Sequence, residues 1–306
     1  MKLHGNVLRL LRISRTVSDL TKLAAFYIKA LGFTNQNETV SKDTAWAKLM
    51  GSPGVRANSI ILQLGMQELE LIAFDPPGQS YPSFSHSSDF WFQHCAIVVD
   101  DMQAAYTRLL RHGGATAISR GGPQILPPSS GSVTAFKFRD PDGHPLELIA
   151  FPAGSGDPVW QKHAAGPSLG IDHSAISVAS PKRSIAFYNE VLGFALSGQQ
   201  TNRGPQQANL DALPDVEVEV IALQSAEATT PHVELLGYRT PRGRALPDLG
   251  NCDIAADRLV MQVQNLSVLL DKLPDASTGP VTISVMADVH AALLCDPDGH
   301  RLLLIE

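Results

Sequence analysis

Two histidines of this sequence stand at matching positions in strand-like segments, and an imidazole can ligate a metal ion or transfer a proton. By strand alternation, His94 shares a face with Ala96, and His173 shares a face with Ala175. A single histidine on a strand is more often structural than functional. The match between the two segments therefore makes both histidines candidates for chemistry.

The matching segments belong to a larger internal repeat. The sequence FYIKALGF at 26–33 returns as FYNEVLGF at 187–194, and DPDGH at 140–144 returns unchanged at 296–300. A repeat of this length indicates a duplicated domain, because solenoid repeats have periods of roughly 20–50 residues. Where the copies differ, we expect one copy to have kept a chemical role that the other has lost.

The composition favours a soluble, cytoplasmic protein of ordinary domains. The chain has 306 residues, of which 44% are hydrophobic, and its formal net charge is −6. This is enough apolar material for two domains with real cores. No run of Lys or Arg indicates nucleic acid or an acidic membrane as a partner, and no apolar run is long enough for a membrane span. The three cysteines lack CxxC spacing and are predicted to be reduced, small hydrophobic residues.

The elements that must position the histidines follow one pattern four times. Each unit begins with a strand and a helix and then continues with several strands. We predict two units in residues 1–152 (1–76 and 89–152) and two in 171–306 (171–240 and 253–306). Residues rich in Pro, Gly and Ser at 75–88 and 152–170 are interpreted as linkers, the second of which separates the two halves at 153–170.

These motifs resemble those of the vicinal oxygen chelate superfamily, which includes glyoxalase I, extradiol dioxygenases and bleomycin-resistance proteins. The resemblance is carried by the strand with FYxxxLGF at 8–33 and 171–194, and by DPDGH with its strand at 140–151 and 296–306. It implies an α+β fold of four βαβββ modules in tandem, paired into two half-open barrels. It does not fix the reaction, because one fold hosts many functions.

The resemblance also implies where metal ligands would lie. In this family each module can offer one ligand from its first strand and a glutamate from its last strand. These positions hold His94 with Glu147 in the second module and His173 with Glu234 in the third. The first module keeps at most the glutamate, with Glu70 beside Arg12, and the fourth keeps neither ligand, with Arg258 and Leu303 at these positions. We expect one divalent ion (Ni, Co, Mn, Fe or Zn) on the four inner residues, since imidazole and carboxylate suit all of these metals.

Two pairings of modules occur among such proteins. If modules two and three pair, the four ligands meet in one pocket, and modules one and four form a second, metal-free pocket with Arg12 and Arg258. If modules one and two pair, the ligand set is divided. One complete site and one abandoned site is the simpler account, so we favour the first pairing. A single chain would then hold the whole site, whether the protein is a monomer or a homodimer.

The implied function is that of a glyoxalase-type isomerase or lyase acting on a small substrate with vicinal oxygens through a metal-stabilised enediolate. Glu147 would be the base and Glu234 its partner, because a carboxylate can take a proton from a carbon next to a polarised carbonyl. The family positions for glutathione-contacting residues hold Ser177 and Tyr238, so a less anionic substrate is expected. His232, which shares a strand face with Glu234, is a further candidate for the pocket lining.

Two other functions remain open at this point. In an extradiol-type ring-cleavage dioxygenase, His94, His173 and Glu147 would form a two-histidine, one-carboxylate iron site. Glu234 argues against this, because it occupies a position that oxygen or substrate would need. A non-catalytic, ligand-sequestering protein of the bleomycin-resistance type needs no metal and would leave the His and Glu pairs unexplained.

Overall fold

The computed structural model describes residues 6–36, 38–161, 166–245, 249–273, 282–286 and 289–306. The first module contains β1 (Asn6–Thr16), α1 (Leu20–Leu31), β2 (Thr34–Asn35), β3 (Val40–Ser41), α2 (Thr44–Leu49), β4 (Arg56–Leu64) and β5 (Gln67–Asp75). The second contains β6 (Gln93–Val98), α3 (Met102–His112), β7 (Thr116–Ala117), β8 (Gln124–Ile125), the 3₁₀ turn η1 (Pro128–Ser130), β9 (Thr134–Arg139) and β10 (Pro145–Ala150).

The second half of the chain repeats this order after the 3₁₀ turn η2 (Pro158–Gln161). The third module contains β11 (Gly170–Ser177), α4 (Pro181–Ala186), its π-helical continuation η3 (Phe187–Val191), β12 (Ala195–Arg203), α5 (Pro205–Asp211), β13 (Glu217–Gln224) and β14 (His232–Thr240). The fourth contains β15 (Arg258–Gln264), α6 (Leu266–Leu270), β16 (Thr282–Met286), β17 (Val289–Cys295) and β18 (Arg301–Ile305).

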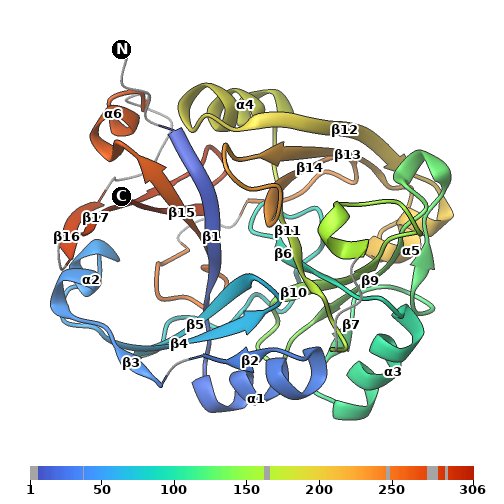
Figure 1. Ribbon diagram of the computed structural model, residues 1–306, viewed down its shortest axis with the longest axis horizontal. Coiled ribbons are helices and arrows are strands. Elements are labelled where there is room, and N and C mark those ends of the chain that lie inside the picture. Colours follow the sequence, from blue (N-terminus) through green and yellow to red (C-terminus); the bar gives the residue numbers. More distant parts are fainter. Residues whose placement is uncertain (1–5, 37, 162–165, 246–248, 274–281, 287–288) are drawn as a thin grey trace.

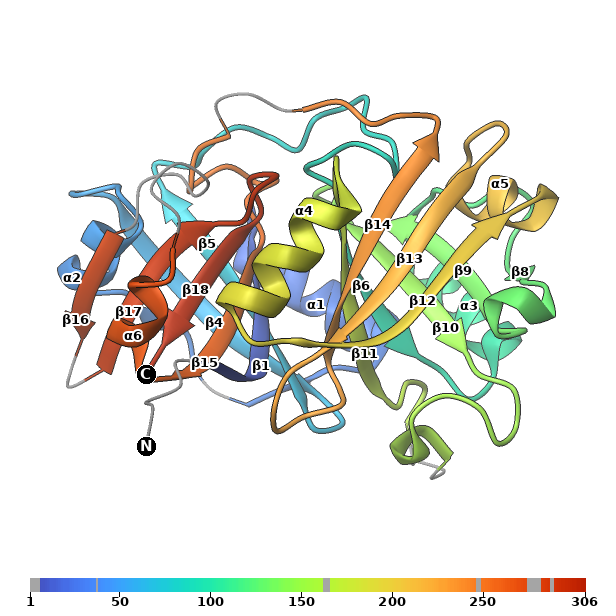
Figure 2. The same ribbon diagram turned by 90° about the horizontal axis from the view of Figure 1, so that it is seen from above.

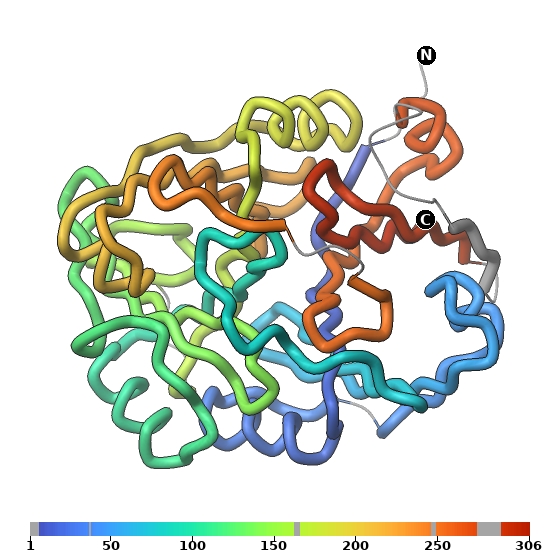
Figure 3. The backbone as a smooth tube through the Cα atoms, turned by 180° about the vertical axis from the view of Figure 1, so that it is seen from behind, coloured from blue at the N-terminus to red at the C-terminus, as the bar shows by residue number. Residues whose placement is uncertain are grey.

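The strands of the described residues form two mixed sheets of nine strands each. One sheet has the order β16-β17-β18-β15-β1-β5-β4-β2 with β3 beside β4, and the other has β12-β13-β14-β11-β6-β10-β9-β7 with β8 beside β9. Each sheet curves without closing, and the two lie side by side (Figure 1). Figure 3 shows the ends of the chain in one half of the molecule and its middle in the other. The favoured pairing of modules two with three and one with four is therefore confirmed.

The helices begin and end where local chemistry requires. Asp19 caps α1 by accepting the backbone N–H of Lys22, and Gly32 ends the helix with a φ of 83°. Asp101 caps α3 in the same way through Ala104. In Figure 1, α4 lies at the top of the molecule and α1 at the bottom, and Figure 2 shows both near the junction of the two sheets. None of the helices in the described part of the chain has the length and apolar character needed to cross a membrane.

The repeated motifs contact each other at the junction between the two sheets. The hydroxyl of Tyr27, from the first FYxxxLGF motif, donates to Asp140 of the first DPDGH motif at 2.8 Å. Tyr188 donates to Asp296 in the second pair of motifs at 3.3 Å. The closing histidine of the first DPDGH motif, His144, is fully buried and its Nε2 contacts the carbonyl oxygen of Ile254 at 2.9 Å. These contacts therefore join module one to module two, and module three to module four, across the boundary between the two sheets.

An apolar cluster fills the concave side of the sheet made by modules one and four. Trp46, Leu49 and Met50, from α2 and its C-terminal cap, are buried against Phe74 and Leu303. Leu303 stands where the last-strand ligand was expected. This half of the protein is therefore packed with side chains at the place where the other half has a cavity.

Candidate metal centre

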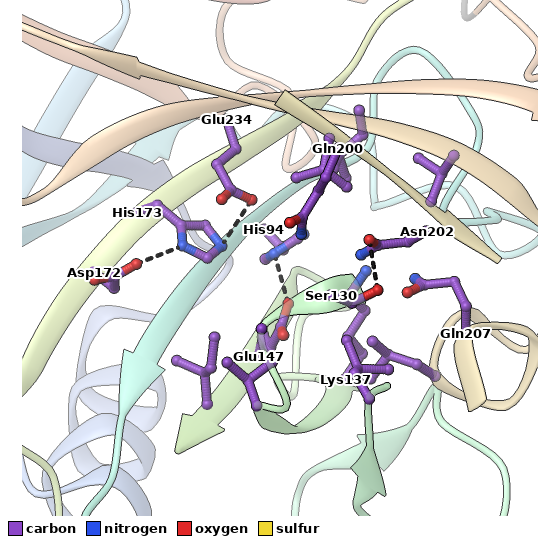
Figure 4. A pocket seen from close by; sticks show the side chains of 18 of the residues that line it. His94, Ser130, Lys137, Glu147, Asp172, His173, Gln200, Asn202, Gln207 and Glu234 are labelled. Carbon is purple, nitrogen blue, oxygen red and sulfur yellow. Dashed lines mark hydrogen bonds and ion pairs between the residues drawn. The ribbon is translucent and has the colours of Figure 1, made fainter. Parts of the chain in front are cut away.

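Strand register sets the four candidate ligands on one face of the sheet made by modules two and three. β6 and β10 run parallel and pair Ala96 with Glu147, which leaves His94 two residues earlier on the same face. β11 and β14 repeat the arrangement, pairing Ala175 with Glu234, with His173 two residues earlier. Because β6 and β11 pair with each other at the centre of the sheet, the two His/Glu pairs face one another (Figure 4).

The donor atoms of these residues converge. His94 Nε2 lies 2.8 Å from Glu147 Oε2, and His173 Nε2 lies 3.5 Å from Glu234 Oε2. One ligand atom each from His94, Glu147 and His173 lie within 4.8 Å of one another. Two imidazoles bound to one ion must have ligating nitrogens within about 5 Å, so this spacing suits a shared ion.

The local charges favour the ligand forms of three of the four groups. Burial lowers the pKa of His94 and keeps the imidazole neutral, although Glu147 opposes this. Burial would raise the pKa of Glu147, but His94 and Lys137 lower it. Burial would also raise the pKa of Glu234, but His173 and His232 lower it to about 2. Both carboxylates are therefore ionised near neutral pH.

His173 is held by a partner that the sequence did not reveal. Its Nδ1 lies 2.9 Å from Asp172 Oδ2, and Asp172 in turn accepts the indole N–H of Trp160 at 2.6 Å. Burial would lower the pKa of His173, but Glu234 and Asp172 raise it to about 9. An ion that binds His173 near neutral pH must therefore displace the proton on Nε2. In the neutral ring, the carboxylate on Nδ1 fixes the tautomer that presents Nε2 to the ion, which is the usual outer support of a metal-bound histidine.

No motif marked either Asp172 or Trp160. Trp160 lies in the segment that composition predicted as a linker, yet it is buried on the sheet beside Val98 and Ile149. Its large apolar side chain, followed by a strand, was the one available signal that this segment packs.

A cavity of about 220 Å³ opens beside the four candidate ligands. Its polar lining beyond them includes Ser130, Lys137, Asp172, Gln200, Asn202, Gln207 and Tyr238, and its apolar lining comes chiefly from β8–β10, β13 and β14 and their adjoining loops. Tyr238 thus lies where it was expected. His232 contacts Glu234 at 3.5 Å but is not part of this lining, and the Ser177 hydroxyl donates to the carbonyl of Ser87 outside it.

The donor set fits a divalent transition metal. Neither ring nitrogen of His94 has a hydrogen-bond partner of good geometry among the described residues, although the side chain is 2% exposed. The close contact of His94 Nε2 is the carboxylate of Glu147 at 2.8 Å. A buried imidazole beside a carboxylate, a second imidazole and a second carboxylate matches a binding site for an ion. Two nitrogens and two carboxylate groups are acceptable to Mn, Fe, Co, Ni and Zn alike.

The equivalent positions of the other sheet cannot serve in this way. Glu70 is buried and bound by Lys42 at 2.7 Å and by Arg12 at 3.6 Å, so its charge is already balanced. Arg258 is buried, donates to Thr16 and lies over the ring of Phe74. Arg12 and Arg258 lie on adjacent strands of this sheet, and α2 packs against strands of the same sheet. The second, metal-free pocket expected around these two arginines stays a prediction.

The sequence matches the family model of the Glyoxalase/Bleomycin resistance protein/Dioxygenase superfamily over residues 9–148 and 170–304. The chain therefore belongs to this superfamily, as the sequence motifs predicted. No curated protein sequence matches the chain at a significant level.

Solved structures share the fold along almost the whole chain. Glyoxalase I from Zea mays superposes with a TM-score of 0.63 at 16% identity, covering 99% of this chain and 92% of the maize chain. A protein of Bacillus subtilis, provisionally described as a dioxygenase, has a TM-score of 0.56 at 14% identity and covers 98% and 85% of the two chains. At such identities the likeness establishes the fold and leaves the reaction open.

Proposed function

We propose that this protein is a metal-dependent lyase or isomerase of the glyoxalase type, acting on a small substrate with vicinal oxygens. The observation that carries the proposal is the convergence of His94, Glu147 and His173 donor atoms within 4.8 Å, with Glu234 in contact with His173. We propose these four residues as the ligands of one divalent ion. Such an ion, when bound, supplies a Lewis acid that polarises a substrate carbonyl.

Glu147 and Glu234 are the proposed proton-transfer residues. Both are ionised and both face the cavity, so either can take a proton from a carbon next to a carbonyl and return it to the neighbouring carbon. Glu147 is the better base, because Glu234 is held between His173 and His232, and these contacts lower its basicity. The apolar walls of the cavity limit the access of water to the reacting carbon.

A metal titration tests this proposal. Protein stripped of metal should take up about one ion of Ni, Co, Mn, Fe or Zn per chain, with ligand distances of roughly 2.0–2.2 Å for Zn. His94→Ala and His173→Ala should each abolish stoichiometric binding. His112→Ala, which removes an exposed histidine from α3, is the matched control. Binding that survives both site variants, or that never reaches one ion per chain, would contradict the proposal and favour a ligand-sequestering protein.

One observation favours a second candidate function. The compact donor group contains two histidines and one carboxylate, which is the ligand set of Fe(II) oxygenases, while Glu234 also contacts His232. An extradiol-type dioxygenase would load with Fe(II) under anaerobic conditions and consume oxygen stoichiometrically with a catechol on exposure to air. Oxygen uptake measured with an electrode, against Zn-loaded protein as control, distinguishes the two functions.

A further inference from the structure

At the end of the cavity away from His173, the buried side chains of Lys137 and Gln207 line the wall, and Asp211 lies behind them and contacts both. Lys137 comes from β9, where it pairs directly with Glu147, and Gln207 and Asp211 come from α5. Gln207 and Asp211 are 3% and 2% exposed. Figure 4 shows Lys137 and Gln207 on the opposite side of the cavity from Asp172 and His173.

Asp211 balances the charge of Lys137. Lys137 Nζ donates to Asp211 Oδ1 at 2.7 Å, and the two side chains are 4% and 0% exposed. A buried ammonium paired at this distance is not free to bind an anionic substrate. The cationic group in the cavity lining is thus already neutralised.

Asp211 also fixes the amide of Gln207. Its Oδ2 accepts the Gln207 Nε2 at 2.8 Å, so the other end of the amide, Oε1, is the atom left to interact with something else. Oε1 is buried, belongs to a residue that lines the cavity, and has no hydrogen-bond partner among the described residues. Buried acceptors are normally satisfied by protein, ordered water or ligand.

We propose that Gln207 Oε1 is a specificity-determining acceptor for a hydroxyl or N–H group of a neutral substrate. Asp211 is the positioning residue that orients this amide and neutralises Lys137. This inference rests on the proposed function, since it concerns the part of the substrate that extends beyond the two metal-binding oxygens. The substrate class that fits is an uncharged carbonyl compound with a hydroxyl group next to the carbonyl and a further hydroxyl beyond it.

The test compares the affinities of three neutral probes, each of which has one hydroxyl group more than the one before it. Hydroxyacetone, dihydroxyacetone and erythrulose all carry a carbonyl beside a hydroxyl, and each successive probe adds one more hydroxyl group. Calorimetry on Co-loaded protein should show an affinity gain of at least about tenfold at one step of this series. Gln207→Met, which keeps the length of the side chain but removes the amide, should abolish that gain. Gln206→Met, an exposed change in the same helix, should retain it.

The quantity measured is the ratio of the affinities of two successive probes for the same variant. A loss of binding that affects both probes equally leaves this ratio unchanged. The absence of a step in the wild-type protein, or its persistence in Gln207→Met, would overturn the proposal and assign Oε1 to ordered water. Metal content of the same samples separates the two ideas. Protein that holds no ion contradicts the proposed function, whereas protein that holds the ion and binds hydroxyacetone without a step contradicts only the role of Gln207.

A charge variant tests the positioning role of Asp211 independently. Asp211→Asn removes the partner of Lys137 and should leave a free cation in the cavity. The affinity for dihydroxyacetone phosphate relative to dihydroxyacetone should then rise about tenfold. A merely structural role of Asp211 would not change this ratio, and an unchanged ratio in folded protein would overturn the charge-balancing role.

Discussion

At the scale of single residues, the candidate site contains both proposed metal ligands and residues that hold those ligands in place. His94 has no hydrogen-bond partner of good geometry among the described residues, while His173 is held by Asp172 and through it by Trp160. The first imidazole lies against the carboxylate of Glu147, which is itself a candidate ligand, and the second is oriented by a separate carboxylate before any ion arrives. This difference leads to separate predictions for the base and for the support.

Glu147→Gln should reduce catalytic activity far more than metal affinity, if Glu147 is the base. An amide oxygen can still ligate but cannot take a proton, so we expect a loss of about 10²–10⁴-fold in kcat. Metal affinity, measured by competition with a chelating dye, should change by less than about tenfold. Equal losses of activity and affinity would mean that Glu147 is only a ligand.

Asp172→Asn should weaken metal binding without removing a ligand. The charge that supports His173 is lost, and supports of this kind are worth about 10–100-fold in metal affinity. Asp157→Asn is the control, because this carboxylate lies just before the turn η2 that carries Trp160 and accepts the backbone N–H of Val159. A metal affinity equal to that of the control would show that Asp172 serves the fold alone.

At the scale of elements, α2 distinguishes the two sheets, because among the described residues it packs against the sheet of modules one and four. Its buried face inserts Trp46 and Leu49 against strands of modules one and four, around the position of Leu303. In the other sheet, β8, η1 and α5 stand at the edge and leave the concave side open to the four candidate ligands. The loss of ligands in the outer modules thus accompanies the filling of their barrel.

Leu303→Glu should therefore fail to create a second metal site, although it restores a ligand type. A carboxylate placed in the apolar cluster around Leu303, which is 4% exposed, should lower the free energy of unfolding by roughly 3–5 kcal/mol. Leu303→Met, as control, should cost less than about 1.5 kcal/mol. Chemical denaturation and metal analysis check both parts. A stable variant that binds a second ion would contradict the packing argument.

At the scale of the whole molecule, a buried polar network holds the two halves together. Asp140 accepts hydrogen bonds from Tyr27 and contacts His144, while Arg15 reaches both Asp257 and the carbonyl of Pro145. Burial would raise the pKa of Asp140, but His144, Arg15 and Tyr27 lower it to about 2. Burial would lower the pKa of His144, but Asp140 raises it.

These shifts predict how stability depends on pH. The folded pKa of Asp140 lies below the unfolded value of about 3.9, so its stabilisation is present above pH ~4 and is lost as the pH falls towards 2. The folded pKa of His144 is raised, so its stabilisation is complete below the unfolded value of about 6.5 and is lost as the pH rises through the folded pKa. The pair stabilises the fold most between about pH 4 and 6.5.

Asp140→Asn should cost at least about 2 kcal/mol of unfolding free energy in this pH range, and less on either side of it. Urea denaturation followed by tryptophan fluorescence at several pH values measures the difference. Asp271→Asn, an exposed change at the end of α6, should leave the pH profile unchanged. A cost for Asp140→Asn that stays constant from pH 2 to pH 9 would contradict the assignment.

The repeated modules and the faces of the strands follow from the amino-acid sequence, and the resemblance to the family then named the four candidate ligands on those faces. This was possible because alternation along a strand is local: once His94 and Glu147 are placed on their strands, the face each occupies follows from counting. The motifs also predicted the family and, from the pattern of retained ligands, the pairing of modules two and three.

The side chains that support the candidate ligands, or pack near the equivalent positions of the outer modules, are far away in the sequence and were found only in the folded structure. Trp160 reaches Asp172 from a segment without a recognisable motif, Asp211 neutralises a lysine from another module, and α2 packs against the sheet of modules one and four. The closing histidines of the DPDGH motifs, His144 and His300, are buried and contact the carbonyl oxygens of Ile254 and Ser177. Such contacts depend on how separate elements pack against each other, and no periodicity within one element contains that information.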